Sequence, residues 1–296
     1  MKNLRPDLLE KYERLIKKNK DEMELNLPYM NLKSVLSAYF ILADYFTDAT
    51  ADTEQETMFV EVLHLDLLQS ALGRQIVSCG GKVKYREPLQ ICATLFYGLV
   101  KNHCFVDGNK RTALLTLLYQ LDQFGYLPAV SQNEFEELTV AVAANRLQQK
   151  YSQQWQKAHR IENYTDHCVE TIRLKLKKMT KKKDNTFHIR ITAEELINRI
   201  KQIEGCSCVV EGGKVKFRRV VEKRVLGLKY KREEKAYTIV YHGATRTVGA
   251  ETVRDILQHL DLYEQYPDYQ TFIEGADPRY MLIQTFEYPL RRLKDR

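Results

Sequence analysis

The stretch that organises this chain reads His103-Cys104-Phe105-Val106-Asp107-Gly108-Asn109-Lys110-Arg111-Thr112-Ala113-Leu114. One apolar run, at 91–100, leads into it, and a second, at 113–121, follows it. A His, an Asp, a Gly, an Asn, a Lys and an Arg are concentrated between the two runs with few spacers. Burying so many polar groups is costly unless each is used, so we interpret this stretch as a candidate functional site.

The residues that follow the motif predict a helix from about residue 111 to 124. Four leucines recur at spacings of three and four residues and so lie on one helical face: Leu114, Leu117, Leu118 and Leu121. Gly108-Asn109 then precedes the first turn, where backbone N–H groups lack partners and the helix dipole attracts anions. Gly108 lets the backbone approach an anion without a Cβ in the way. Lys110 and Arg111 add positive charge at the same place.

Two further side chains flank this predicted anion site. Asp107 is placed to hold Mg²⁺, which prefers oxygen ligands and shares them with phosphates. His103 lies at the other end, and an imidazole suits the role of general base acting on a hydroxyl. The set predicts transfer from a magnesium nucleotide to a hydroxyl, driven by positioning and charge stabilisation. The alternative is a polar loop with His103 as a structural residue, but the order and spacing of the whole set favour the functional interpretation.

The pattern His-x-Phe-x-Asp-Gly-Asn-Lys-Arg resembles the active-site loop of the Fic/Doc family, HxFx(D/E)GN(G/K)R. The similarity extends upstream through 67–74 and 80–85 and downstream to about Gly125. It implies a transferase, either a protein adenylyltransferase or a Doc-like protein kinase, that uses ATP and Mg²⁺ on a protein hydroxyl. The resemblance makes His103 the catalytic base and Asp107 the metal ligand. It assigns the nucleotide phosphates to four residues: Gly108, Asn109, Lys110 and Arg111.

Three positions depart from the pattern of many AMP-transferring members. Lys110 replaces a second glycine and resembles the Doc branch, in which the terminal phosphoryl group is thought to move. Leu114 stands where those members have a second arginine that clamps the γ-phosphate, and Cys104 replaces a proline. AMP transfer and phosphoryl transfer therefore both stay open. A catalytically degenerate Fic protein, acting as a nucleic-acid-binding or regulatory docking module, is the alternative to an enzyme.

A glycine pair upstream of the motif signals a hairpin, because Gly80-Gly81 is flanked by the β-forming residues Val77 and Tyr85. Fic/Doc proteins have a short β-hairpin flap that docks the target as an added strand. The resemblance gives this target-docking role to four residues: Gly80, Gly81, Lys82 and Val83. An ordinary loop is the alternative.

The length of 296 residues suits two domains, and the formal charge of +7 is mildly basic. No apolar run is long enough to span a bilayer, and the first residues carry no signal-peptide pattern. We therefore expect a cytoplasmic protein with no membrane partner. Six dispersed cysteines, at 79, 92, 104, 168, 206 and 208, fit reduced thiols better than a zinc site.

Helical periodicity dominates the first part of the chain, with helices expected over 5–20, 31–46, 59–72, 88–102, 134–150 and 151–180. We therefore predict a mainly α fold, a Fic-type helical bundle over 1–180. Seven Lys or Arg and no acidic residue fall between Arg173 and Lys183, and we interpret 181–186 as a basic linker.

Beyond the linker, 187–296 predicts a small α+β domain with a tyrosine-rich tail that packs on it. Thr192 and Glu195 form a capping box for a first helix. Strands follow at 206–210, 214–220 and 235–241, with Gly212-Gly213 as a hairpin signal, and a second helix spans 250–260. This order of helix, three strands and helix predicts one helical layer on one antiparallel sheet.

This second domain resembles the HicA-type toxins, which share a double-stranded-RNA-binding-like fold. The similarity lies in 195–197, the Gly212-Gly213 hairpin, 241–243 and 252–257, and Lys214 stands where cleaving members have a His. The resemblance implies a toxin, with an antitoxin partner, whose second domain binds RNA or DNA without cleaving it. Basic residues interleaved with aromatics support such a surface. The candidates are Lys214, Lys216, Arg218, Arg219, Lys229, Lys231 and Arg232. Basic residues that protect a sheet edge are the alternative.

Overall fold

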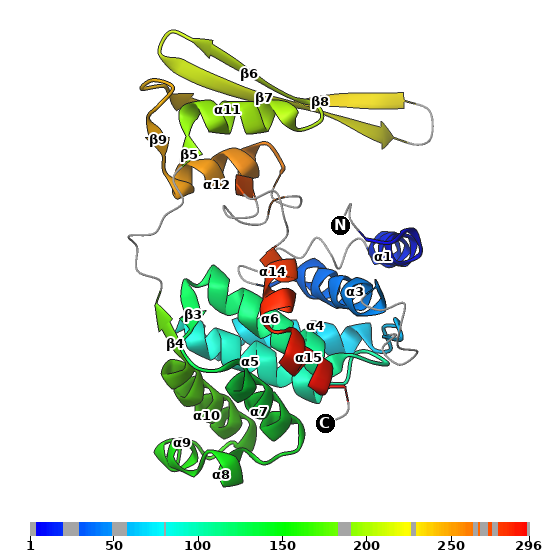
Figure 1. The fold of residues 1–296 in the computed structure, drawn as a ribbon, viewed down its shortest axis with the longest axis vertical. Helices are drawn as coiled ribbons and strands as arrows, with labels where there is room; N and C mark the ends of the chain where they lie inside the picture. Colours follow the sequence, from blue (N-terminus) through cyan, green and yellow to red (C-terminus); the bar gives the residue numbers. More distant parts are fainter. Residues whose placement is uncertain are drawn as a thin grey trace. The chain divides into compact units, whose positions relative to one another are not determined.

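The computed structural model describes residues 4–19, 30–48, 58–79, 81–182, 191–225, 229–262, 266, 272–273 and 278–294. The chain divides into two compact units, which Figure 1 shows as a helical body and a body with a sheet. Unit 1 comprises Met1–Lys183 together with Arg279–Arg296, and unit 2 comprises Asp184–Pro278. The predicted class is confirmed, because the fold is mainly α with a small α+β part.

Helix α6 is the centre of unit 1. It spans Asn109–Gln123, and every residue from Arg111 to Leu121 is buried, as expected for a helix surrounded by others. Helices α3 (Leu32–Asp48), α5 (Pro88–Lys101) and α7 (Gln132–Ala143) pack against it. Helix α5 starts at Pro88 as predicted, with a capping box between Glu87 and Gln90.

The remaining elements of unit 1 surround this centre. The helices are α1 (Pro6–Lys18), α4 (Leu65–Gly73), α8 (Leu147–Lys150), α9 (Ser152–Lys157), α10 (Tyr164–Met179), α14 (Pro278–Thr285), α15 (Glu287–Arg292) and the 3-10 helix Arg74–Ile76. The strands are β1 (Ser78–Cys79), β2 (Lys82–Val83), β3 (Tyr126–Pro128) and β4 (Thr180–Lys182).

Three sequence predictions about unit 1 helices are wrong. The helix expected over 59–72 begins only at Leu65, because the backbone of 61–64 bonds to the motif loop. The helix expected over 134–150 breaks at Asn145, which adopts a left-handed φ of 58°. The helix expected over 151–180 is two helices, α9 and α10, joined by a turn.

The C-terminal tail also departs from the prediction, since 279–296 belongs to unit 1 and not to the small domain. Its apolar face is buried in the helical core through Ile283, Phe286, Leu290 and Leu293. These residues recur every three or four positions, so the tail is a helical stripe that needs an apolar partner. Unit 2 is thus an insertion within unit 1. The predicted linker lies mostly outside the described residues, and Lys181 and Lys182 pair with β3 as part of β4.

Replacing Phe286 by alanine is therefore expected to destabilise unit 1 rather than unit 2. Phe286 is buried and packs edge-on against Phe135 of α7, with ring centroids 5.7 Å apart. Removing such a ring costs about 3–5 kcal/mol of unfolding free energy. When the variant is heated, amide hydrogen exchange should become faster in α6 and α7 than in the wild type. Phe217→Ala, in the core of unit 2, should instead speed exchange in the sheet, and the reverse pattern would contradict the assignment of the tail.

Unit 2 has the predicted order of helix, three strands and helix. Helices α11 (Ala193–Gln202) and α12 (Ala250–His259) accompany the antiparallel sheet of β6 (Cys206–Glu211), β7 (Lys214–Val225) and β8 (Lys229–Val240), with β7 in the middle. A short pair, β5 (Ile191–Thr192) and β9 (Thr247–Val248), lies beside α11. The Thr192–Glu195 capping box is present. Strands β7 and β8 are longer than predicted.

Candidate active site

The motif forms the loop between α5 and α6, and the side chain of Asn109 holds the loop closed. Its Oδ1 accepts the Phe105 N–H at 3.0 Å, and its Nδ2 donates to the Phe105 carbonyl at 2.6 Å. One amide thus satisfies both backbone groups of a residue that belongs to neither helix. The ring of Phe105 stacks on Tyr39 of α3, with centroids 4.0 Å apart. The loop is therefore fixed at both its backbone and its side chains.

Gly108 begins α6 in a conformation that favours glycine. It occupies the N-cap position with φ of 79° and supplies no side-chain cap to the first-turn amides. An ideal Cβ at Gly108 would meet the end of the flexible Met58 side chain. The sequence predicted that an anion approaches the backbone at this point. In the structure Met58 lies there, and the left-handed backbone is what favours glycine.

Asp107 is held by Arg111 one helical turn away. The Arg111 Nη2 donates to both carboxylate oxygens of Asp107, at 2.9 and 3.0 Å, and the Gly108 N–H donates to Oδ1. The Arg111 side chain is 3% exposed, whereas that of Asp107 is 31% exposed. The Nε of Arg111 is buried, and it has no hydrogen-bond partner among the residues that the structure describes. Arg111 therefore positions Asp107 from within the core, and Asp107 keeps one side open to solvent.

An extended segment that sequence analysis missed covers the loop. We call 58–64 the strap. The Val106 N–H donates to the Glu61 carbonyl at 3.1 Å, and the Leu63 and His64 N–H groups donate to the Cys104 carbonyl. Val62 and Phe105 form an antiparallel bridge. The spacing of the apolar residues in this segment predicted a helix. The sequence signal for an extended segment was the presence of β-forming residues such as Val60 and Val62, with no proline among them.

Tyr39 anchors the strap to α3. Its hydroxyl accepts the Glu61 N–H at 3.0 Å and lies 3.2 Å from the carbonyls of Phe59 and Glu61. Burial is the main cause that raises the pKa of this hydroxyl above its ordinary value, so it stays a neutral donor. The Phe59 N–H also donates to Asp107 at 3.3 Å. The strap thus adds one hydrogen bond to the predicted metal ligand.

His103 lies at the start of the loop with its side chain exposed to solvent. Its backbone adopts a left-handed φ of 48°, which is uncommon for a residue with a side chain and is found enriched at functional sites. Cys104, next to it, is buried, and burial raises the pKa of its thiol to about 11. Cys104 is therefore a neutral packing residue, and His103 is the group that reaches solvent at this end of the loop.

Comparison with known protein families finds one similarity, within unit 1. Residues 29–121 match the Fic/DOC family. The match covers α3 to α5, the strap, the motif and most of α6, and the rest of unit 1 and all of unit 2 lie outside it. Neither the curated proteins nor the solved structures contain a match to the chain. The resemblance of unit 2 to HicA-type toxins gains no support from these comparisons.

Phe46 of α3 lies beside two guanidinium groups, and the second of them was not predicted from the sequence. The Cζ atoms of Arg111 and of Arg291 in α15 lie 5.6 and 5.4 Å from the ring centroid of Phe46. Glu287 holds Arg291 at 2.7 Å. Leu114, where the resemblance would place a second arginine, is fully buried. Residues so far apart in the chain carry no pairwise signal in one sequence, so only the fold brings Arg291 to Phe46.

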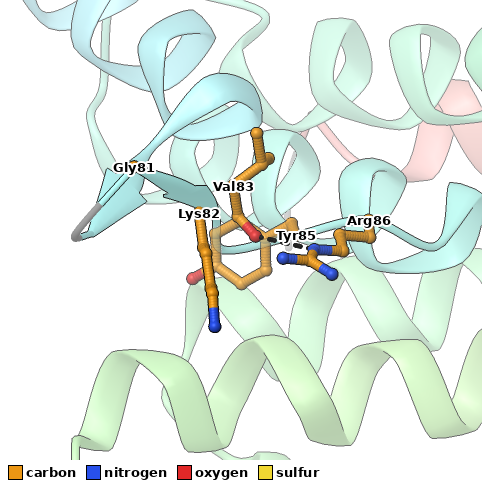
Figure 2. A pocket seen from close by; sticks show the side chains of 5 residues that line it. All are labelled: Gly81, Lys82, Val83, Tyr85 and Arg86. Carbon is orange, nitrogen blue, oxygen red and sulfur yellow. Dashed lines mark hydrogen bonds between the residues drawn. The ribbon is translucent and has the colours of Figure 1, made fainter.

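The predicted flap is a hairpin in the structure. Ser78 pairs with Val83 and Cys79 with Lys82, and Gly81 has a φ of 75°, whereas Gly80 lies outside the described residues. Lys82 and Val83 are exposed. A shallow hollow on the flap is lined by Gly81, Lys82, Val83, Tyr85 and Arg86, and in it the Arg86 Nε donates to the Val83 carbonyl at 3.2 Å (Figure 2). Docking of a target remains a prediction.

Asp166 of α10 anchors this flap. It accepts from Lys84 at 2.6 Å and from the Tyr85 hydroxyl at 2.8 Å. Burial raises the pKa of Asp166, but the hydrogen bonds from Lys84 and Tyr85 together outweigh it and leave the pKa lowered. Because the folded-state pKa of Asp166 is lowered, its ionised carboxylate stabilises the fold at pH values above the unfolded-state pKa. This stabilisation is lost as the pH falls through the folded-state pKa.

Asp166→Asn is accordingly expected to loosen the hairpin without unfolding unit 1. Losing the charge-assisted bonds removes about 1–2 kcal/mol of local stability. The Lys84 N–H, which donates to the Val77 carbonyl at 2.8 Å, should exchange with solvent about 5–30-fold faster near neutral pH. The difference from wild type should shrink in acid, where Asp166 is protonated in both states. Unchanged exchange of that amide would show that Asp166 does not hold the flap.

The predicted nucleic-acid residues of unit 2 fall into four groups. Arg219 faces α12, where its Nη1 donates to the Leu260 carbonyl at 3.0 Å. Arg218 pairs with Glu234 at 3.5 Å. Lys214 and Lys216 lie on β7, and Lys214 is opposite Glu211. The backbone of Lys229, Lys231 and Arg232 belongs to β8, and their side chains lie outside the described part.

Within the described residues, no cluster of three His, Cys, Asp or Glu has the arrangement of a metal site. The helices that the structure describes also include none with the length and apolar character needed to cross a membrane.

Proposed function

We propose that this protein is a Fic-type transferase that moves AMP or a phosphoryl group from Mg-ATP to a hydroxyl of a protein target. The observation that carries the proposal is the loop of 103–108. It has an exposed imidazole at one end and an uncapped helix start at the other, with Asn109 fixing the backbone between them. Helix starts of this kind bind phosphate through their N–H groups and dipole.

The residues beside the loop suit a magnesium nucleotide. Mg²⁺ keeps several waters and takes one or two carboxylates together with phosphate oxygens, so one partly exposed carboxylate is a sufficient protein contribution. Asp107 would be that ligand, oriented by Arg111. When bound, the ion would supply charge neutralisation at the phosphates. Lys110 and the Asn109 to Arg111 amides would orient the phosphate chain at the start of α6.

In the proposed reaction, His103 accepts the proton of the target hydroxyl as its oxygen attacks a phosphorus atom of ATP. Attack at the α-phosphorus forms the ester to AMP and breaks the bond to pyrophosphate. Attack at the γ-phosphorus forms a phosphoester and releases ADP. Lys110 favours the second course by its resemblance to the Doc branch, and the buried Leu114 removes the usual γ-phosphate clamp of the first.

The test is label transfer from ATP carrying ³²P at the α or the γ position, with the full-length protein, MgCl₂ and a bacterial lysate. Protein label from α-³²P alone identifies AMP transfer, and label from γ-³²P alone identifies phosphoryl transfer. Label from neither, with protein that is folded by circular dichroism, would contradict the enzyme proposal.

The biological role proposed for this activity is that of a toxin in a bacterial toxin–antitoxin or defence system, restrained by an antitoxin. The competing role is a degenerate Fic protein that only docks a partner. Expression in a bacterial host separates them, since a toxin should arrest growth with an intact motif. Equal growth with and without induction would favour the docking role.

A further inference from the structure

The strap and the motif loop pair as two short antiparallel strands, with Val62 opposite Phe105. The hydrogen bonds between them lie on either side of this position, at the Leu63 N–H and at the Glu61 carbonyl. Val62 and Phe105 are therefore a pair without mutual hydrogen bonds, and the N–H and C=O groups of each point away from the other strand. These groups need partners beyond the pair.

The two outer edges of this strand pair differ. On the loop edge, the side chain of Asn109 binds both backbone groups of Phe105. On the strap edge, the backbone of Val62 has no hydrogen-bond partner among the residues that the structure describes. Within the same residues, none is found for the backbone of Val60, which lies two positions away and so points to the same side. The strap therefore has an unpaired strand edge, to which an extended segment of another chain can add.

The side chains of the strap define the kind of segment that fits this edge. Phe59, Glu61 and Leu63 alternate along the strap and share its exposed face, whereas Val60 and Val62 pack on the core. Phe59 is 61% exposed and Leu63 is 51% exposed, so a segment that covered them would remove apolar surface from water. The exposed Glu61 carboxylate between them has no ion pair within the described part of the chain. A complementary segment is apolar, basic and apolar at alternate positions.

We propose that the outer edge of the strap binds an extended segment of a protein partner as an added β-strand. Apolar side chains of the segment lie beside Phe59 and Leu63, and a basic one lies beside Glu61. Main-chain hydrogen bonds supply affinity, and the alternating side chains supply specificity. This site is separate from the hairpin at 78–83, and its binding does not depend on the transfer activity proposed above. Because the Phe59 N–H donates to Asp107, the added strand lies beside the candidate active site.

The test uses the full-length, isotope-labelled protein and two capped peptides, Ser-Val-Thr-Lys-Thr-Val-Ser and the same peptide with Glu in place of Lys. In the free protein, the Val60 and Val62 amides should exchange rapidly with solvent. Saturation with the Lys peptide should slow their exchange about 2–12-fold, the effect of one net hydrogen bond. The Val106 amide, which already donates to the Glu61 carbonyl, should not change. Unchanged exchange of the Val60 and Val62 amides at millimolar Lys peptide would overturn the proposal.

Reversing the charge of Glu61 tests the proposed side-chain pattern. The wild type should bind the Lys peptide about 2–30-fold more tightly than the Glu peptide, because opposite charges across a strand pair attract and like charges repel. Glu61→Lys should prefer the Glu peptide by a similar factor. Its fold should be kept, because the side chain is exposed and the backbone bond to Tyr39 is retained. A peptide preference that does not change with the charge of residue 61 would overturn the proposed position of the basic side chain.

Val62→Pro tests the backbone contact. Proline removes only the outward N–H from the backbone, and it is tolerated on strand edges where that group faces solvent. This variant should bind the Lys peptide about 2–12-fold more weakly than Val62→Ala, which also loses the valine side chain but keeps the N–H. Thermal melts show whether both variants are folded, and the charge reversal at Glu61 keeps the test independent of the proline variant. Equal affinity of two folded variants would overturn strand addition at this edge.

Discussion

Replacing His103 by alanine is expected to lower the rate of label transfer from ATP by about 10²–10⁴-fold, the usual contribution of a positioned general base. The variant should keep its stability, because the imidazole is exposed and the loop is held by Asn109 and Phe105 rather than by His103. Nucleotide binding should also persist. The measurement is the initial rate of protein labelling, with ATP labelled at the position from which the wild type transfers label. A thermal melt of each protein checks that the variant is folded.

His64→Ala provides the matched control for this comparison. His64 is also exposed and lies on the strap next to the motif, but it contacts the loop through its backbone N–H, which alanine retains. Its transfer rate should equal that of wild type. Equal loss of activity in both variants would mean that the loop region tolerates no change, and equal activity in both would exclude His103 as the base.

Gly108→Ala is expected to destabilise unit 1 by about 1–3 kcal/mol. The left-handed conformation costs an alanine about 1–2 kcal/mol, and displacing the end of the flexible Met58 side chain adds no more than about 1 kcal/mol. Urea unfolding gives the free energy directly. The transfer rate should fall as well, because the alanine strains the backbone where α6 begins.

Gly125→Ala isolates the two causes. Gly125 follows α6, has a φ of 73°, and has open space where a Cβ would be, so only the conformational cost of about 1–2 kcal/mol applies. Combining Gly108→Ala with Met58→Ala should recover up to about 1 kcal/mol relative to the sum of the single changes. Equal costs at Gly108 and Gly125 would show that Met58 does not press on the glycine.

Much of the fold was predictable because its signals are local. The leucine spacing after Arg111 predicted α6, Pro88 predicted the start of α5, and Thr192 with Glu195 predicted the start of α11. The two glycine pairs predicted both hairpins. Each of these patterns depends on residues only a few positions apart, so the local structure that it predicts does not depend on distant parts of the chain.

The failures concern contacts between distant segments. The strap has helix-like spacing, and only its bonds to Cys104 and Val106 make it extended. The tail has an apolar stripe that fits either unit, and the core of unit 1 provides the partner. In the site, the motif predicted a loop before the start of α6, but the burial of Arg111 and the packing of Met58 on Gly108 depend on α3 and the strap. The roles of base, metal ligand and phosphate site stay predictions.

The central claim is that nucleotide phosphates bind at the start of α6, across the loop from His103. The most direct measurement is the amide chemical shift of Asn109, Lys110 and Arg111 in the isotope-labelled protein as Mg-ATP is added. The account predicts saturable shifts that are largest at these amides and at His103, together with a smaller response at Asp107 when magnesium is omitted. Saturable shifts confined to other parts of the chain, with these amides unmoved, would contradict it.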